Sequence, residues 1–314
     1  GPSACSLAAA CTRKHGLDAP GLTMTHGYLI STGLNILLAW SAYVILMSGS
    51  LSFANGAFMA LGAYGSGVLT VKFGWPLLAA MPVAAMGTAI VAVLLSLPAL
   101  RTRGVYLILI TIGLSLCLRA VLESTAYIGG VRGLSGLTGT ELWHIAVLVV
   151  AVGLLLWWIS RSPLQRVLDA VREDESVARS MGINTVFVKA AMFGVGAAIA
   201  ALAGALYAHH MVFVRPENFD ILVSIYIVLY VILGGTNNLW GPVIGAAAMT
   251  LLPEVLRVLA DWRPMLFRAL VVLMLLVRPE GLLSFRTRSI RAGKAAEADK
   301  VARLAAGEQA GAVR

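Results

Sequence analysis

The sequence predicts an all-α protein: a polytopic transmembrane helical bundle of about eight or nine spans, with a broken helix near the N-terminus and an amphipathic cytoplasmic helix. Three observations favour this fold class. Hydrophobic residues make up 59% of the 314 residues and charged residues only 12%, whereas a soluble domain is normally about a quarter charged. The mean hydropathy is +0.86. Apolar stretches recur along the chain, and most are near the roughly 20 residues needed to span a bilayer core.

The predicted spans, in chain order, are residues 28–47, 51–71, 75–100, 105–122, 142–159, 188–213, 221–233, 243–259 and 265–277. Two of them are shorter than about 17 residues, the usual lower limit for a spanning helix. Only a Ser-Gly-Ser sequence at 48–50 separates the first two, so one crossing is expected to consist of broken half-helices. Broken helices are tolerated in a membrane only where protein or a water-filled cavity satisfies the freed backbone groups. Residues 48–67 are therefore the first candidate for a pore lining.

Glycines at helical spacing within the spans predict close helix packing, because small residues let membrane helices approach one another. Only the glycines beside Asn55 support a pore hypothesis as well. The glycines concerned are Gly62, Gly65, Gly67, Gly194, Gly196 and Gly204.

Basic residues orient the chain in the membrane. The net charge is +9, but this does not indicate nucleic-acid binding, because the basic residues gather at the ends of spans. The positive-inside rule predicts that the three basic segments are cytoplasmic. These segments contain Arg101 and Arg103; Arg161, Arg166, Arg172 and Arg179; and Arg286, Arg288, Arg291 and Lys294.

The chain divides into three parts. Residues 1–23 have no clean signal-peptide pattern and are interpreted as an N-terminal extension or a remnant of expression cloning. Residues 24–285 form the transmembrane domain, and residues 286–314 form a solvated, basic and Ala-rich cytoplasmic tail. The cysteines, Cys5, Cys11 and Cys117, do not have the spacing of metal ligands.

A charged block with a helical pattern, residues 161–187, separates two of the spans. Ser162 and Pro163 predict a helix start with a capping side chain and a proline at the first helical position. A second helical piece, from about residue 173, is expected to end in a left-handed cap at Gly182. A docking arm and a surface loop without a partner both fit this pattern. The apolar stripe of the first helix comprises Leu164, Val167, Leu168 and Val171.

Residues 166–184, R-x-L-x-A-x-R-E-x-E-x-x-A-x-x-M-G-I-N, resemble the cytoplasmic ATPase-coupling loop of ABC-type permeases of the branched-chain amino acid family. Other segments are similar to the same family in the same order, so the resemblance extends from about residue 31 to 283. These segments are 33–35 with 49–64, 103–106 with Thr111, 129–134, Lys189 with Phe193 and 200–207, 233–246, and 278–281.

The resemblance implies the membrane half-channel of an importer in a bacterial inner membrane. In this family two permease subunits pair, and the second is usually a related, non-identical chain. Two ABC ATPase subunits bind beneath them, and a periplasmic binding protein delivers a branched-chain amino acid or a similar small solute. The chain has no G-x-x-x-x-G-K-[ST] sequence, so ATP and Mg²⁺ are expected on the ATPase partners. We expect this chain to be no enzyme and to bind no cofactor or metal itself.

Two groups of candidate site residues follow. The expected ATPase contact consists of apolar residues that fill a cleft, charges that fix the register and a glycine that turns the chain: Leu164, Leu168, Arg172, Glu173, Glu175 and Gly182. Neutral polar groups within spans suit the passage of a zwitterion or small polar solute, although each alone could form a helix–helix hydrogen bond. These are Ser52, Asn55, Tyr64, Tyr106, Thr111, Ser115, Ser224 and Tyr226.

Arg119 is a further candidate for the translocation path, because charged groups within a membrane are usually functional. An interfacial ion pair with Glu123, four residues further on, or a snorkelling side chain also explains it.

An ion-coupled secondary transporter or channel for a small polar solute is the alternative function. Coupling to protons or sodium usually needs acidic residues at mid-membrane, and the predicted spans contain Glu254 alone. An intramembrane metalloenzyme has less support, because the sequence has no H-E-x-x-H motif. His209 and His210 are adjacent, so they point to different sides of a helix and cannot easily share a metal.

Overall fold

The computed structural model describes residues 20–255, except residues 101, 103, 126, 127, 138, 139, 141 and 237. The helices are α2 (Pro20–Met47), α3 (Asn55–Phe73), α4 (Leu77–Ala99), α5 (Val105–Ser124), α6 (Leu142–Arg161), α7 (Pro163–Glu173), α8 (Glu175–Ser180), α9 (Thr185–Met211), α10 (Ile221–Gly234) and α11 (Trp240–Val255). Shorter elements join them: the 3-10 helices η2 (Gly130–Arg132) and η3 (Pro216–Phe219), and the strands β1 (Leu134–Ser135) and β2 (Phe213–Val214).

In the described part of the chain, six helical segments are long and apolar enough to cross a membrane. They correspond to the predicted spans at 28–47, 75–100, 105–122, 142–159, 188–213 and, together with η3, 221–233. The total of eight or nine spans stays a prediction. The predicted span 265–277, the last part of 243–259, residues 1–19 and the tail 286–314 lie outside the described residues.

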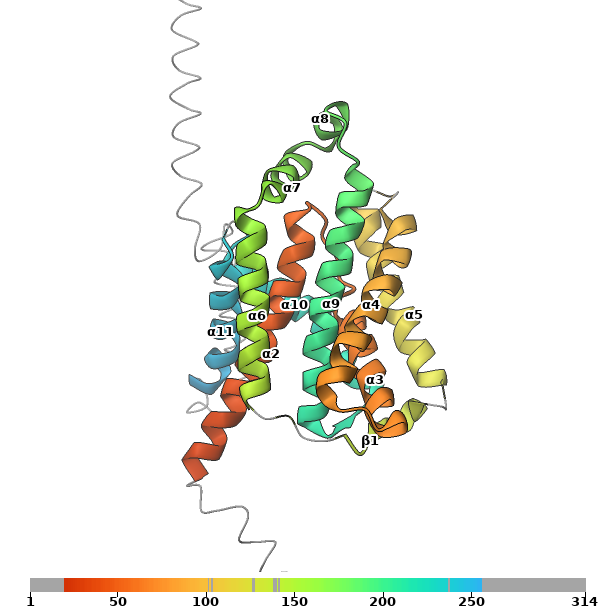
Figure 1. Cartoon of the computed structure of the whole chain (residues 1–314), viewed down its shortest axis with the longest axis vertical. Coiled ribbons are helices and arrows are strands. Elements are labelled where there is room, and N and C mark those ends of the chain that lie inside the picture. The colour runs from red at the N-terminus through yellow and green to blue at the C-terminus, as the bar shows by residue number, and fades with distance from the viewer. Residues whose placement is uncertain are drawn as a thin grey trace, which may run out of the picture.

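The helices run between two ends of the bundle. Figure 1 shows α7 and α8 at one end and β1 at the other. Ala99 of α4, Leu107 of α5 and Ala190 of α9 belong to one buried cluster. The turn between α4 and α5 therefore lies at the same end as α7 and α8. Because the positive-inside rule predicts that both of these connections are cytoplasmic, we call this the inner end and the opposite one the outer end.

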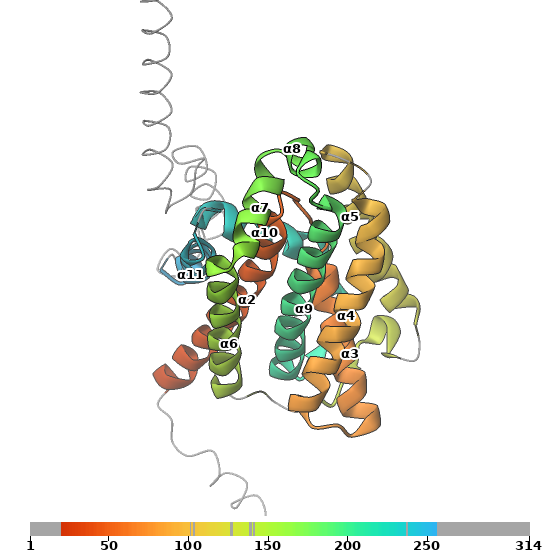
Figure 2. The same ribbon diagram turned by 45° about the horizontal axis from the view of Figure 1, so that its top comes forward.

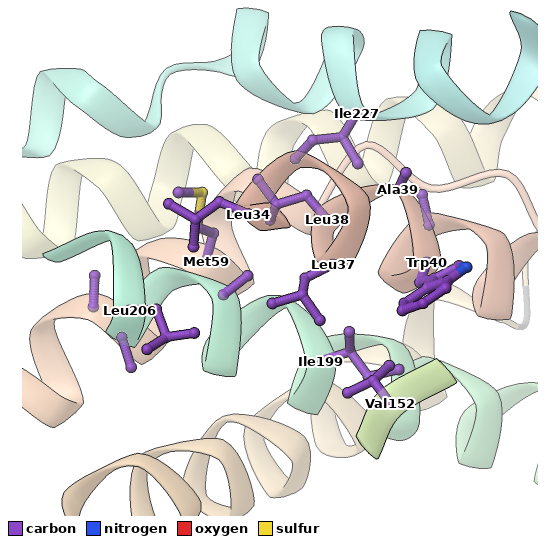
Figure 3. Close-up of a cluster of buried hydrophobic side chains, with 14 of the residues drawn as sticks. Leu34, Leu37, Leu38, Ala39, Trp40, Met59, Val152, Ile199, Leu206 and Ile227 are labelled. Atoms are coloured by element: carbon purple, nitrogen blue, oxygen red, sulfur yellow. The ribbon is translucent and has the colours of Figure 1, made fainter. Parts of the chain in front are cut away.

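The helix α9 lies at the centre of the bundle. It packs against α2, α3 and α4, and Figure 2 shows it between α2 and α4. Larger side chains fill the space around it. Figure 3 shows Leu37 and Trp40 of α2, Val152 of α6 and Ile199 of α9 in one buried cluster. This arrangement places the described core around α2 and α9.

Glycines bring α3 and α9 into backbone contact. A β-carbon on Gly62 would overlap the backbone of Ala201, and one on Gly204 would overlap the backbone carbonyl of Met59. Gly194 and Gly196 of α9 are similarly close to α4 and α2. The expectation of close packing is therefore confirmed at these four positions.

The connections at the outer end also pair with each other. β1 and β2 form a short antiparallel ladder in which Leu134 lies opposite Val214. The hydroxyl of Thr140 donates to the backbone carbonyl of Leu206 at 3.1 Å. These bonds fix the chain before α6 to the outer end of α9.

We expect Gly62→Ala and Gly204→Ala each to destabilise the protein, because an added methyl group would force α3 and α9 apart. Overpacking of a core typically costs about 1–3 kcal/mol. Thermal unfolding of the detergent-solubilised protein measures the effect. The matched control is Gly113→Ala on α5, where a β-carbon meets no atom within 4 Å. This control should be neutral or slightly stabilising, since alanine is favoured over glycine in helices. Equal midpoints for all three variants would contradict the assigned packing.

Candidate functional site

The chain is interrupted between α2 and α3, where the sequence predicts a break. Residues 48–54 are not helical. The interruption begins at the inner end, because a β-carbon on Gly49 would lie 3.2 Å from the Cα atom of Arg172 in α7. It ends at Asn55, the first residue of α3. The segment therefore leads from the surface of the inner end into the bundle.

Hydroxyl groups of α5 bind the backbone of Phe53 within this segment. The Phe53 N–H donates to Oγ1 of Thr111 at 3.2 Å, and Oγ of Ser115 donates to the Phe53 carbonyl at 2.9 Å. Oγ of Ser52 accepts from the Ala54 N–H at 3.2 Å. Backbone groups that are freed inside a membrane require such partners. Three residues predicted to line the path, Ser52, Thr111 and Ser115, thus hold the broken segment in place.

These bonds lie near the middle of α5, a helix long and apolar enough to cross a membrane. Ser115 is about ten residues, or roughly 15 Å, from the inner end of α5, and a bilayer core is about 30 Å thick. The helix α3 therefore begins at about half depth. Beside it is the first turn of α10, where Oγ of Ser224 accepts from the Gly56 N–H at 2.9 Å. Two helix N-termini, each with a partial positive charge, meet at this point.

Asn55 is the buried polar group that these contacts leave without a partner. Its side chain is inaccessible to solvent, and neither Nδ2 nor Oδ1 forms a hydrogen bond. The buried hydroxyl of Ser50 also has no partner. Buried polar groups are nearly always hydrogen-bonded, and an unpaired one costs stability. Among the described residues predicted to line the path, Asn55 is therefore the one whose side chain is fully buried and has no hydrogen bond.

Arg119 forms an ion-pair cluster that joins α5 to α10. Its Nε–H donates to Oε1 of Glu123 at 2.8 Å, and Nη1 donates to Oδ1 of Asp220 at 2.9 Å. The same Asp220 oxygen accepts from the Ile221 N–H and caps α10. The expected pair with Glu123 is confirmed. Asp220 could not be found from sequence spacing, because it lies 101 residues from Arg119.

Two of the three tyrosines predicted to line the path, Tyr64 and Tyr106, lie away from this centre. Tyr64 is buried in α3, and its hydroxyl donates to the carbonyl of Val214 at 3.4 Å. Tyr106 is 71% exposed near the inner end of α5. The structure therefore groups Ser52, Asn55, Thr111, Ser115 and Arg119 around the break but does not bring these tyrosines to it.

At the inner end, α7 packs onto the bundle with one side. Leu168 and Val171 are buried, so Leu168 faces its own subunit rather than a partner, whereas Leu164 is 36% exposed. Arg172 donates from Nη2 to Oγ1 of Thr236, at 3.0 Å, in the turn after α10. The predicted start of α7, with Ser162 as the N-cap and Pro163 as the first helical residue, is confirmed. The predicted side-chain cap is wrong, because the Ser162 hydroxyl instead donates to the carbonyl of Ile159 at 2.8 Å.

Asp174 and Gly182 define the ends of the α8 segment. Oδ1 of Asp174 accepts from the backbone N–H groups of Ser176 and Val177 and caps α8. Gly182 has φ +84°, which confirms the expected left-handed turn. The second helical piece of the predicted arm thus exists, although it is shorter than expected.

Glu175 connects α8 to the start of α9. Its carboxylate binds Lys189 at 2.8 Å and accepts from the Thr185 hydroxyl at 3.1 Å, and it also pairs with Arg179. Burial by itself would raise the pKa of Glu175, but the bonds and charges of Lys189, Thr185 and Arg179 outweigh it and lower the pKa below its ordinary value. Glu175 thus braces the loop from within. Glu173 is exposed, and no bond of its side chain is described.

Three large apolar side chains on this loop and its junction with α9 are exposed. They are Val177 at 53%, Met181 at 74% and Phe187 at 70%. The α8 segment is too short for its apolar residues to form a stripe at helical spacing. Its exposed side could have been found only from the buried Ala178, which fixes the orientation of α8.

His209, one of the two adjacent histidines near the outer end of α9, is held by hydrogen bonds within the bundle. His209 is fully buried, and its ring nitrogens bond to the carbonyl of Ala205 at 2.8 Å and to Oγ1 of Thr70 at 3.2 Å. Among the described residues there is no group of three or more His, Cys, Asp or Glu side chains that could hold a metal ion. His209 instead joins α9 to α3.

Comparison with known proteins assigns the chain to a family. Residues 24–278 match the family described as "Branched-chain amino acid transport system / permease component". The chain is 31% identical over 298 residues to the high-affinity branched-chain amino acid transport system permease protein LivM of Salmonella typhimurium. This alignment covers 83% of the chain and 68% of the relative. LivM of Escherichia coli is 30% identical over 303 residues, which cover 85% and 69% of the two chains.

A second type of permease is also similar. LivH of Escherichia coli is 28% identical over 144 residues, which cover 45% of the chain and 46% of the relative. No solved structure matches the chain. Together with the apolar helices long enough to cross a bilayer, these relatives make the chain a multi-pass membrane protein. It belongs to the family of permease components of branched-chain amino acid transport systems.

Proposed function

We propose that this chain is one of two membrane-spanning subunits of an ATP-driven (ABC) importer in a bacterial inner membrane. It translocates a branched-chain or other hydrophobic amino acid, or a similar small solute, which a periplasmic binding protein delivers. The observation that carries this proposal is the internally braced loop at the inner end, which presents apolar side chains to solvent.

The proposed partner in the membrane is a related, non-identical permease. The chain is similar to LivM over most of its length and to LivH over a shorter segment. Relatives of both types carry names of high-affinity branched-chain amino acid transport permeases, which supports a pair of such subunits.

Buried side chains and hydrogen bonds within the subunit brace the loop, as a lever requires. Leu168 and Val171 anchor α7, Arg172 binds Thr236, and Glu175 ties α8 to Lys189. In the proposed mechanism two ATPase subunits, which hold ATP and Mg²⁺, close beneath the membrane. Their closure displaces α7 and α8 as a unit and shifts the packed helices between two states.

The contact surface differs from the one that the sequence alone favours. Leu168 and Glu175 have partners within their own subunit and therefore support the arm. Exposed apolar groups rimmed by polar ones are typical of interaction sites. We assign the ATPase contact to Leu164, Val177, Met181 and Phe187, with Arg172, Glu173 and Gly182 at its edge.

In the proposed translocation path, Asn55 is the central polar group. It lies at the N-terminus of α3, where a partial positive charge favours the carboxylate of an amino acid. Its free amide can donate and accept hydrogen bonds. The segment 48–54 then leads from this point toward the inner end.

The alternative is an ion-coupled transporter or channel. Asp220, immediately before α10, is an acidic residue that lies just outside the predicted spans. However, its Oδ1 is engaged by both Arg119 and the N–H of Ile221, so this carboxylate serves the ion-pair cluster and the cap of α10.

We expect Met181→Glu to reduce solute-stimulated ATPase activity at least tenfold, because a charge would be placed in the apolar contact. The matched control, Met181→Leu, retains the apolar surface and should keep most of the activity. The measurement is ATP hydrolysis by the complex purified from its native membrane and reconstituted in vesicles, with and without solute. Membrane insertion should be normal in both variants, since Met181 is 74% exposed.

Normal stimulation in Met181→Glu would contradict the docking assignment. If the chain purifies without an ATPase, and uptake follows an imposed proton or sodium gradient instead, the ion-coupled alternative is correct.

We expect acidification to loosen the loop. The folded-state pKa of Glu175 is lowered, so its ionised form contributes stability above its ordinary pKa of 4.5, and this contribution is lost as the pH falls through the lowered value. A nitroxide label on Ser180→Cys, in a background without other cysteines, should become mobile as the pH falls from neutral to below about 4. In Glu175→Gln the label should be mobile already at neutral pH. A label equally immobile in both proteins at neutral pH would exclude Glu175 as the brace.

A further inference from the structure

A cavity of about 270 Å³ lies between α2, α3, α9 and α10, outside the broken segment. Its outer end is formed by Ser31, Met211 and Asn218, of which Met211 is 45% exposed. Its inner end is closed by Leu38, Met59 and Ile227, which are all buried. Figure 3 shows these three side chains in the same buried cluster. Met211 and Asn218 are exposed at the outer end, and Tyr226 of α10 is 39% exposed. The cavity is therefore open at its outer end and beside Tyr226, and it stops short of the inner end.

The size of the cavity suits a small solute. At about 30 Å³ per molecule, it has room for roughly nine waters. This is close to the number of heavy atoms in leucine, and it lies just below the roughly 300 Å³ of the smallest usual ligand pockets.

The lining combines aliphatic side chains with polar but uncharged ones. Leu34, Leu38, Met59, Val223 and Ile227 supply aliphatic surface. The polar residues are Ser31, Asn35, Tyr207, Asn218, Tyr226 and Tyr230. No described residue of the lining is Asp, Glu, Lys, Arg or His. Such a surface accommodates an apolar side chain next to groups that can form hydrogen bonds.

Several polar groups of the lining have bonding capacity to spare. Within the described part of the chain, no hydrogen bond involves the hydroxyls of Tyr226 and Tyr230, which lie one turn apart on the same side of α10. Asn35 donates from Nδ2 to Oγ1 of Thr250 at 2.9 Å, which fixes the amide and leaves its carbonyl oxygen able to accept. Hydroxyls and a fixed carbonyl can bind both the carboxylate and the ammonium of a zwitterion.

We propose that this cavity binds a neutral amino acid with an aliphatic side chain as it enters from the outer end. The proposal rests on the importer function and adds to it a binding site within this subunit. Leu34, Leu38, Met59 and Ile227 contact the side chain of the solute, and Asn35, Tyr226 and Tyr230 bind its polar end. Cationic and anionic amino acids are excluded, because the lining supplies no counter-charge for a buried net charge.

The first test measures occupancy directly. In the full-length chain without its native cysteines, Asn218→Cys places a thiol at the mouth of the cavity. We expect millimolar L-leucine to slow its reaction with a membrane-impermeant maleimide several-fold, whereas L-lysine and L-glutamate leave the rate unchanged. The control is Met181→Cys, the residue that follows α8 at the other end of the bundle. In detergent-solubilised protein the same maleimide reaches both thiols, and leucine should have no effect on the control. No protection by leucine, or equal protection by lysine, would overturn the proposal.

The second test measures selection during uptake. Tyr226→Phe combined with Tyr230→Phe removes two hydroxyls with little change of shape. It should lower leucine uptake several-fold in cells whose uptake depends on this chain. The matched control is Thr88→Val, because Thr88 is buried in α4, bonds within its own helix and does not line the cavity.

The two tests separate the site from the importer function. If uptake requires the chain but both tyrosine hydroxyls are dispensable and leucine gives no protection, the cavity assignment fails and the importer function stands. If leucine protects Asn218→Cys but uptake does not depend on the chain, the site is correct and the importer function fails.

Discussion

A chain that leaves its helix inside a membrane must find a protein partner for each backbone group that it frees, because hydrocarbon offers none. In this protein the requirement falls on residues 48–54. Thr111 and Ser115 of α5 bind the Phe53 backbone, and Ser224 of α10 binds the Gly56 N–H. Most of the α5 surface is exposed, so these bonds and the Arg119 cluster attach it to the bundle.

The position of the break determines where polar groups can exist in the membrane. Because α3 starts at about half depth, its N-terminus meets that of α10, and Asn55 is enclosed there without partners. The close contact of Gly62 and Gly204 keeps α3 against α9 while this irregular start is accommodated. The tight packing and the polar centre are thus both properties of α3, the first along its length and the second at its start.

The sequence predicts features that depend on local spacing and fails where distant elements meet. Apolar runs located six spans, glycine spacing indicated close helix packing but not which helices meet, and the four-residue interval located the Arg119–Glu123 pair. Asp220 was missed because only folding brings it to Arg119, and the cavity was missed because five elements line it: α2, α3, α9, η3 and α10. The apolar stripe of α7 was recognised, but periodicity cannot tell whether Leu168 faces its own subunit or a partner. The structure answers that question because Leu168 is buried within its own subunit.

The break and the inner-end loop are in physical contact, which relates the proposed lever to the proposed path. Gly49 has φ +76° and lies against the backbone of Arg172, so a side chain at this position would be both strained and obstructed. Arg172 also binds Thr236, in the turn that follows α10. A displacement of α7 would therefore act on two segments that lie next to Asn55. It would act directly on residues 48–54, and it would act on α10 through the turn that follows its inner end. Packed contacts of this kind are one physical route by which movement of the inner-end loop can be coupled to the site around Asn55.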